Sequence, residues 1–195
     1  MPHLRQRRQH FLFVGAPMTD LLPSWDLPPS WEPARQAARE GGLLLVLGAS
    51  DLGKSTLAAV LASAAVEAGR ATAVVDSDVG QCSFGPPACV SLARVRKAIV
   101  SLSELTPEAL DFVGSTSPVG HLLGFLTSVE AMADAARAGG AETVVVDTTG
   151  LVAGPIARGL KGQKIRRLDP DVVVALQAEE EMEHLLAPYQ ARSRP

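Results

Sequence analysis

The sequence predicts an α/β fold in which helices cover both faces of a mostly parallel β-sheet. Continuous apolar runs that end in polar residues are typical of strands buried on both faces, and four are present: LLLVLGA (43–49), TAVVDSD (72–78), TVVVDTT (143–149) and DVVVAL (171–176). Between them, residues 55–70 and 122–139 carry apolar side chains at helical spacing, and each stretch closes near a glycine. This alternation of strand and helix indicates parallel strands joined by right-handed crossovers.

The remaining segments give weaker signals. Two further strands are expected at 97–104 and 111–117. Residues 1–40 are interrupted by prolines, so we expect a short, irregular N-terminal arm that packs on the core, with one short helix near 32–40. The predicted organisation is therefore an arm of residues 1–40, a domain of residues 41–187 and a C-terminal tail of residues 188–195.

Composition limits the class of protein. Of the 195 residues 47% are hydrophobic, which suits one domain with a well-developed core. The formal net charge of −3 argues against bulk attraction to nucleic acid, so a polyanion would need a local site. The two cysteines, Cys82 and Cys89, predict neither a disulfide framework nor a zinc site. No apolar run has the length of an export signal or a membrane span, so we expect a cytoplasmic protein with no membrane partner.

Residues 48–55, GASDLGKS, match the phosphate-binding motif G-x-x-x-x-G-K-[ST] in full, between an expected strand and an expected helix. Glycines let backbone N–H groups curl around an anion, and the helix N-terminus adds its positive end. Lys54 is expected to reach the β- and γ-phosphates, and Ser55 to be a ligand for Mg²⁺. The residues expected to contact the nucleotide in this segment are Gly48, Ser50, Asp51, Leu52, Gly53, Lys54, Ser55 and Thr56.

Acidic side chains stand at the ends of two of the predicted strands. Asp76 and Asp78 are two residues apart in an extended segment, so both carboxylates are expected to face the same side, with Gln81 nearby. Asp147 ends another apolar run, the pattern of a second magnesium-coordinating strand. A single Asp in such a place is equally typical of helix capping or a turn. Two such ends beside a complete phosphate loop favour function, with Ser55, Asp76 and Asp147 as the metal ligands.

Four segments in order resemble the polynucleotide 5′-hydroxyl kinase family: GASDLGKSTL, DSDVGQCSFGPPACVSLA, FVGSTSPVGHLL and VVVDTTGLVAGPIARGLK. Members act in RNA 3′-end formation, tRNA splicing and pre-rRNA processing, and the similarity runs from about residue 28 to residue 187. The resemblance implies a P-loop NTPase three-layer sandwich. It also implies ATP-dependent phosphorylation of a 5′-hydroxyl on RNA or DNA, with ATP and Mg²⁺ as cofactors and nucleic-acid 5′ ends as partners.

The resemblance also implies roles for single residues. Lys54, Asp78 and Asp76 would be catalytic, with Asp78 activating the 5′-hydroxyl. Thr148 and Gly150 match the segment that clasps triphosphate and substrate. The residues expected to touch the substrate are Gln81, Thr116, Thr149, Leu151 and Lys161. Leu151 stands where many members have Trp, and we expect the lid region of the family to be truncated in the tail, which ends at QARSRP.

Other interpretations stay open. The basic residues in RGLKGQKIRRL (158–168) either hold nucleic-acid phosphates or belong to a solvated helix end. A regulatory NTPase switch would use the same phosphate loop, although no guanine-reading N/T-K-x-D motif follows a late strand. An inactive module that binds ATP is a third interpretation, and the short tail favours it.

Overall fold

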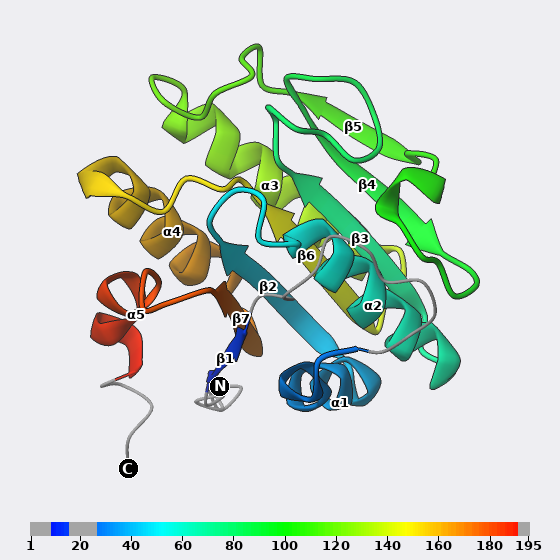
Figure 1. The fold of residues 1–195 in the computed structure, drawn as a ribbon. Helices are drawn as coiled ribbons and strands as arrows, with labels where there is room; N and C mark the ends of the chain where they lie inside the picture. Colours follow the sequence, from blue (N-terminus) through cyan, green and yellow to red (C-terminus); the bar gives the residue numbers. More distant parts are fainter. Residues whose placement is uncertain (1–8, 16–26, 191–195) are drawn as a thin grey trace, which may run out of the picture.

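The arrangement of the chain is known from a computed structural model that describes residues 9–15 and 27–190 (Figure 1). The strands of its sheet are β1 (His10–Gly15), β2 (Gly42–Gly48), β3 (Thr72–Ser77), β4 (Cys89–Val95), β5 (Ala109–Phe112), β6 (Thr143–Thr148) and β7 (Val172–Gln177). Their order across the sheet is β1-β7-β2-β6-β3-β4-β5. The first five strands in this order are mutually parallel, whereas β4 runs antiparallel to both β3 and β5.

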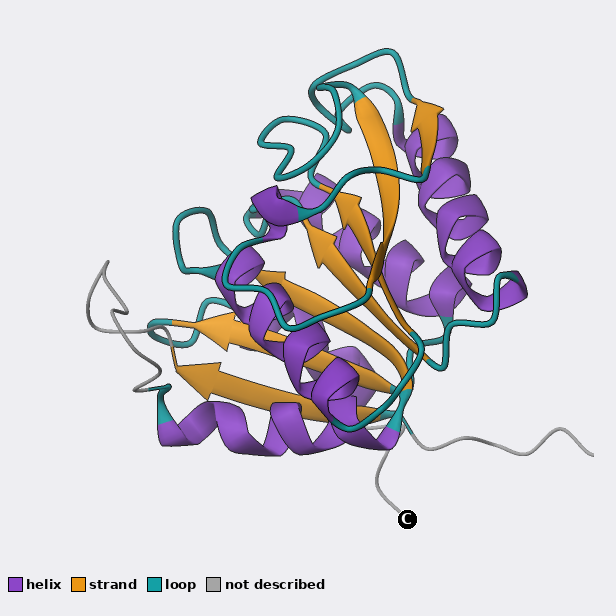
Figure 2. Ribbon diagram, turned by 90° about the vertical axis from the view of Figure 1, so that its right-hand side faces the viewer, coloured by secondary structure: helices purple, strands orange, loops and turns teal. Residues whose placement is uncertain are grey.

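Helices cover both faces of the sheet (Figures 1 and 2). They are α1 (Glu32–Glu40), α2 (Lys54–Glu67), α3 (Leu122–Ala138), α4 (Gly154–Leu168) and α5 (Glu183–Gln190). Alternate side chains of β2 enter different cores: Leu44 and Val46 pack with α1 and α2, while Leu45 and Leu47 pack with α3, α4 and α5. This period-two alternation produces the expected three-layer α/β sandwich, which is confirmed.

The local sequence explains where α2 begins and ends. Gly53 precedes it with φ 88°, a left-handed conformation that a residue with a side chain adopts only at a cost. The helix is apolar nearly all round because it lies between the sheet and α1, and Leu57 and Leu61 are fully buried. Gly69, at φ 79°, then turns the chain toward β3.

Three parts of the secondary-structure prediction were wrong. Residues His10–Gly15, expected in an irregular arm, form the edge strand β1 beside β7. The strand β4, which pairs antiparallel with β3 and β5, was not predicted. Residues 97–104, expected to form a strand, are a loop and a 3₁₀ turn, because Ser101 and Glu104 form a capping box that ends extended backbone. The helix expected near 32–40 is confirmed as α1, and the strand expected at 111–117 is only partly matched by β5.

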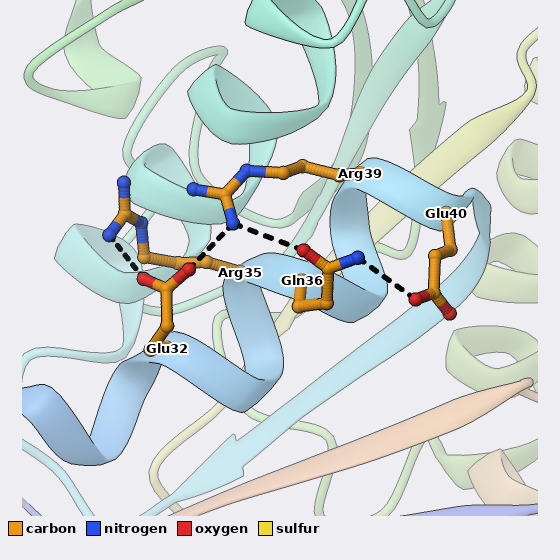
Figure 3. Close-up of polar contacts among 5 residues, drawn as sticks. All are labelled: Glu32, Arg35, Gln36, Arg39 and Glu40. Carbon is orange, nitrogen blue, oxygen red and sulfur yellow. Dashed lines mark hydrogen bonds and ion pairs between the residues drawn. The ribbon is translucent and has the colours of Figure 1, made fainter.

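The exposed face of α1 carries a chain of polar contacts (Figure 3). Glu32 accepts from Arg35 at 2.5 Å and from Arg39 at 2.6 Å, while Gln36 donates to Glu40 at 3.0 Å. Hydrogen bonding to Arg39 lowers the pKa of Glu32. Because these side chains are solvated, the contacts add little to stability, and the opposite face of α1, which packs against α2, anchors the helix.

Within the described ranges, 9–15 and 27–190, no helix has the length and apolar character needed to cross a membrane.

Trp31 links the N-terminal segment to the core. Its side chain is fully buried, and its Nε1–H donates to the Gly15 carbonyl of β1 at 2.9 Å. We expect Trp31→Ala to lower the free energy of unfolding by about 3–5 kcal/mol, because it leaves a cavity and an unpaired carbonyl. Trp31→Phe should cost less, since most of the volume stays.

Urea unfolding measures both changes. Val100→Ala serves as the control because Val100 is 67% exposed, and it should change stability by less than about 0.5 kcal/mol. A Trp31→Ala protein as stable as the parent would mean that the N-terminal segment does not pack as described.

Candidate active site

The site lies where three neighbouring parallel strands end. The phosphate loop follows β2, Asp147 is near the end of β6 and Asp76 is near the end of β3, and these strands are adjacent in the order β2-β6-β3. The ladder places Asp76 directly opposite Asp147. Ligands of open α/β sheets bind at this carboxyl edge, so the fold brings the predicted residues to the expected place.

The phosphate loop has the geometry of an anion cradle. Gly53 is left-handed and α2 begins at the next residue, Lys54, which is 7% exposed. The Lys54 amine donates to the Ala49 carbonyl at 2.7 Å, so the side chain folds back over its own loop. A Cβ at Gly48 would lie 2.7 Å from the Leu176 carbonyl oxygen, which explains the glycine there. Helix N–H groups at such a start lack partners within the helix and favour a phosphate.

Ser55 and Asp147 supply paired oxygen atoms beside this cradle. Ser55 Oγ donates to Asp147 Oδ2 at 2.6 Å, and Asp147 Oδ1 accepts from the Thr148 N–H at 2.8 Å. Burial raises the pKa of Asp147, while the Ser55 hydroxyl and the Lys54 amine oppose that rise. A hydroxyl and a carboxylate in contact are the donor set that Mg²⁺ takes beside a phosphate loop, so the residues fit the metal.

Among the residues that the structure describes, no group of three or more His, Cys, Asp or Glu side chains could hold a metal ion. A cation at Ser55 and Asp147 would therefore complete its coordination with phosphate oxygens and water, as Mg²⁺ commonly does.

Asp76 is buried at 2% exposure and turns toward the loop that follows its own strand. Its Oδ1 accepts from the Asp78 N–H at 2.9 Å, and its Oδ2 accepts from the Ser83 N–H at 2.6 Å. Burial, with Asp147 opposite, raises the pKa of Asp76 to about 7. Both oxygens of Asp76 thus hold the loop, and its role as a metal ligand stays a prediction. Two carboxylates facing each other repel, a strain that a bound cation would relieve.

Asp78 is half-buried and is held by its own turn. Its Oδ1 accepts from the N–H groups of Gly80 at 3.2 Å and Gln81 at 3.1 Å. Within the described part of the chain, its Oδ2 accepts no hydrogen bond, so one oriented carboxylate oxygen remains for a ligand. The negative charge of Asp78 contributes to the raised pKa of Asp147, so the two carboxylates lie close enough to interact electrostatically.

Two surface loops meet beside this centre. A Cβ at Gly80 would lie 2.9 Å from the carbonyl oxygen of Thr116, so the loop after β3 touches the loop after β5. Gln81 and Thr116 are both exposed there. The structure therefore brings together these two predicted substrate residues, which sequence places far apart.

The segment after β6 packs against the phosphate loop. A Cβ at Gly150 would lie 2.5 Å from the Ser50 nitrogen and 2.7 Å from its Cα, so only glycine fits this contact. The Thr149 hydroxyl is buried and, among the described residues, has no hydrogen-bond partner. Leu151 is half-buried and packs on the core with α3 and α4, and its role as a substrate contact stays a prediction.

The other loop residues divide by exposure. Ser50, Asp51 and Thr56 are exposed, whereas Leu52 packs on the core with α1 and α2. Asp51 is left-handed at φ 61°, a conformation that Asp tolerates better than most residues.

The basic segment of α4 does not form one surface. Arg166 and Arg167 are exposed, but Lys161 and Lys164 are 1% and 0% exposed and point toward the sheet. The Lys161 amine donates to Thr148 and Thr149, and the Lys164 amine donates to Ser77. The interpretation as a solvated helix end is therefore wrong for both lysines. Sequence reasoning also missed the contact between Lys164 and Ser77, although apolar neighbours at helical spacing mark the buried face of α4.

Because Gly150 touches the phosphate loop, its substitution tests that contact. We expect Gly150→Ala to push Ser50 aside and to weaken ATP binding by at least about tenfold, the effect of losing about 1.4 kcal/mol of binding free energy. Gly159→Ala is the matched control, since a Cβ at Gly159 of α4 meets open space. Isothermal titration calorimetry measures both affinities, and equal affinities for the two variants would contradict the described contact.

Comparison with known proteins agrees with this geometry. The family model described as mRNA cleavage and polyadenylation factor CLP1 P-loop matches residues 48–193. A polyribonucleotide 5′-hydroxyl-kinase of Methanocaldococcus jannaschii is 39% identical over 151 residues, which cover 77% of this chain and 41% of the relative. The corresponding kinase of Pyrococcus horikoshii is 36% identical over 147 residues, which cover 75% of this chain and 40% of the relative. The chain thus spans about two fifths of the length of these relatives.

Among solved structures, Clp1p in complex with Pcf11p matches with a TM-score of 0.62 and 16% identity, over 83% of this chain and 45% of that one. At this identity the likeness concerns the fold alone, and it agrees with the three-layer sandwich. The resemblance to the polynucleotide 5′-hydroxyl kinases is confirmed by the kinase relatives. With three quarters of its length matched by the family model, the chain belongs to the CLP1 P-loop family.

Proposed function

We propose that this chain is the P-loop domain of an ATP-dependent polynucleotide 5′-hydroxyl kinase, which transfers the γ-phosphate of ATP to the 5′-hydroxyl of RNA or DNA in RNA processing. The archaeal relatives that are named for this activity support the proposal. The observation that carries it is the meeting of three strand ends. Ser55 contacts Asp147 beside the phosphate loop, and Asp78 follows the adjacent strand with one carboxylate oxygen available.

In the proposed reaction, Lys54 leaves the Ala49 carbonyl and donates to the β- and γ-phosphates. Ser55 Oγ and Asp147 Oδ2 would hold Mg²⁺, which when bound neutralises phosphate charge. The Lys54 amine and the metal would thus bind the phosphate oxygens, while the backbone N–H groups of the loop hold the phosphates in place. The site thus orients the γ-phosphate toward Asp78.

Asp78 acts on the acceptor. Its Oδ2 accepts the hydrogen bond of the sugar 5′-hydroxyl, while the Gly80 and Gln81 N–H groups hold Oδ1 in place. As the bond from the sugar oxygen to the γ-phosphorus forms and the bond to the β-phosphate oxygen breaks, the hydroxyl proton passes to Asp78. Since the transition state is loose, positioning contributes more than early proton removal.

We further propose that Gln81, Thr116, Thr149 and Leu151 line the acceptor side, with Thr148 and Gly150 supporting the triphosphate. The proposed organisation keeps residues 41–187 as the kinase domain and 188–195 as a tail, while the arm of residues 1–40 contributes β1 to the sheet and α1 to the core. A cytoplasmic location is proposed as well. The two cysteines, Cys82 and Cys89, are free, which fits a reducing compartment.

The direct test is transfer of labelled γ-phosphate from ATP to 5′-hydroxyl oligonucleotides, one of RNA and one of DNA. We expect Lys54→Ala to lower kcat/KM by at least about 10²-fold, the effect of removing a charge-stabilising donor. Asp78→Asn, which keeps the shape but loses the base, should lower kcat by about 10²–10⁴-fold.

Two matched controls accompany these variants. Lys97→Ala removes an exposed lysine, and Asp111→Asn changes a carboxylate on β5, so both should transfer phosphate at nearly the parent rate. ATP hydrolysis that ignores the oligonucleotide would instead indicate a regulatory NTPase switch. Tight ATP binding with no turnover would indicate an inactive module, and either result would overturn the kinase proposal.

A further inference from the structure

Two lysines of α4 lie buried beneath the site and have no role in the chemistry described above. The chain has only four lysines. One, Lys54, is in the phosphate loop, and Lys161 and Lys164 are buried at the same edge of the sheet. They approach from the face opposite to α2, because α4 packs with α3 and α5. Three of four lysines thus converge on one edge, although lysine is seldom fully buried.

Lys161 joins the ends of β6 and β2. Its amine donates to Thr148 Oγ1 at 3.1 Å and to the Thr149 carbonyl at 2.5 Å, and Thr148 Oγ1 in turn donates to the Val46 carbonyl at 2.8 Å. The pairing of β2 with β6 runs only as far as Leu45 opposite Val146. The Thr148 side chain therefore continues the connection just before β2 enters the phosphate loop.

Lys164 joins the ends of β3 and β6. Its amine donates to Ser77 Oγ at 2.7 Å, and Ser77 Oγ donates to the carbonyl oxygen of Asp147 at 2.5 Å. The amine also lies 4.6 Å from the centre of the Phe125 ring, which supports it from α3. This relay ends on the backbone of the residue whose carboxylate contacts Ser55.

Burial of the two amines costs stability, and the attraction of the nearby carboxylates offsets this cost only in part, because both pKa values are still lowered. Burial lowers the pKa of Lys164 to about 7, and burial together with Lys164 and Lys54 lowers the pKa of Lys161 well below its usual value. Such shifts mean that the interior disfavours the charged amines, and apolar side chains of similar length commonly fill such space at no loss of stability. The hydrogen bonds, however, all end on the strand termini that form the site.

We propose that Lys161 and Lys164 are positioning residues, which act through Thr148 and Ser77 to hold the ends of β2, β6 and β3 so that Asp147 faces Ser55. Neither amine touches the nucleotide. This role replaces the expected contact of Lys161 with substrate, and it rests on the proposed phosphoryl-transfer site. Partners behind metal ligands typically change metal affinity or activity by about 10–100-fold when removed.

The test compares Lys161→Met, Lys164→Met and Ser77→Ala with the parent chain. Arg167→Met is the control, since Arg167 is exposed on the same helix and pairs with Glu130. Three quantities are measured: the thermal midpoint without ligand, the ATP affinity in EDTA and the ATP affinity with Mg²⁺. We expect the Met variants to have unchanged or higher thermal midpoints and nearly the parent ATP affinity in EDTA. The factor by which Mg²⁺ raises ATP affinity should fall at least about tenfold.

A double-mutant cycle separates positioning from packing. If Lys164 acts through Ser77, the variant with both changes should lose no more of the Mg²⁺ effect than either single variant. Ser77→Ala keeps both lysines, so it tests the relay even if a Met variant does not fold. Lower midpoints with an intact Mg²⁺ effect, or effects that add, would overturn the inference.

Phosphate transfer by the same proteins is measured separately with Mg²⁺, and kcat/KM for ATP is expected to fall at least about tenfold because the metal-linked part of ATP binding is lost. A parent chain that binds Mg²⁺ and ATP together but transfers no phosphate would overturn the proposed function. The positioning role would still be tested, because the effect of Mg²⁺ on ATP affinity is measured without catalytic turnover.

Discussion

The hydrogen bond from Ser55 to Asp147 joins the phosphate loop to the neighbouring strand, and the site depends on it. That contact exists because β6 lies between β2 and β3, all three parallel. Because side chains alternate between the two faces along each strand, successive residue pairs at the strand ends face different helices. Asp76 and Asp147, paired across the ladder, face the side of α2, while the next pair, Ser77 and Thr148, faces the lysines of α4. One register thus supplies both the carboxylates and their support.

Electrostatics explains why this edge is suited to a cation and a triphosphate. Burial raises the pKa values of Asp76 and Asp147, with the charge of Asp147 adding to the rise at Asp76 and that of Asp78 to the rise at Asp147, so these carboxylates favour a positive partner. The amine of Lys54 provides part of that charge, and a metal held by Ser55 and Asp147 would provide more. The lysines of α4 donate to hydroxyl and carbonyl oxygens at the strand ends, and the charges of Asp78 and Asp147 act on both amines from further away. Hydrogen bonds therefore hold the strand ends, while the buried carboxylates of Asp76 and Asp147 favour a bound cation.

Sequence predicted the layers of the fold because long apolar runs and helical spacing are signals of local pattern. It missed β1, whose conformation depends on pairing with the distant strand β7, and β4, which pairs antiparallel with its sequence neighbours β3 and β5. The phosphate loop and the acidic strand ends were located from motifs and from the rule that such ends meet at one edge. The contacts of Lys161 and Lys164 could not be predicted from motifs, because the orientation of a helix side chain depends on which face of the helix packs on the sheet. A lysine-rich segment resembles a solvated surface until the packing of α4 is known.

The most direct measurement of the central claim is binding of Mn²⁺, as a substitute for Mg²⁺, to the chain with ATP, followed by electron paramagnetic resonance. Parent protein should hold one metal per nucleotide. Asp147→Asn and Ser55→Ala should each weaken that binding by at least about tenfold, with Asp111→Asn unchanged, because two paired oxygens supply the protein's share of the coordination. Parent-like Mn²⁺ binding by Asp147→Asn would contradict the account.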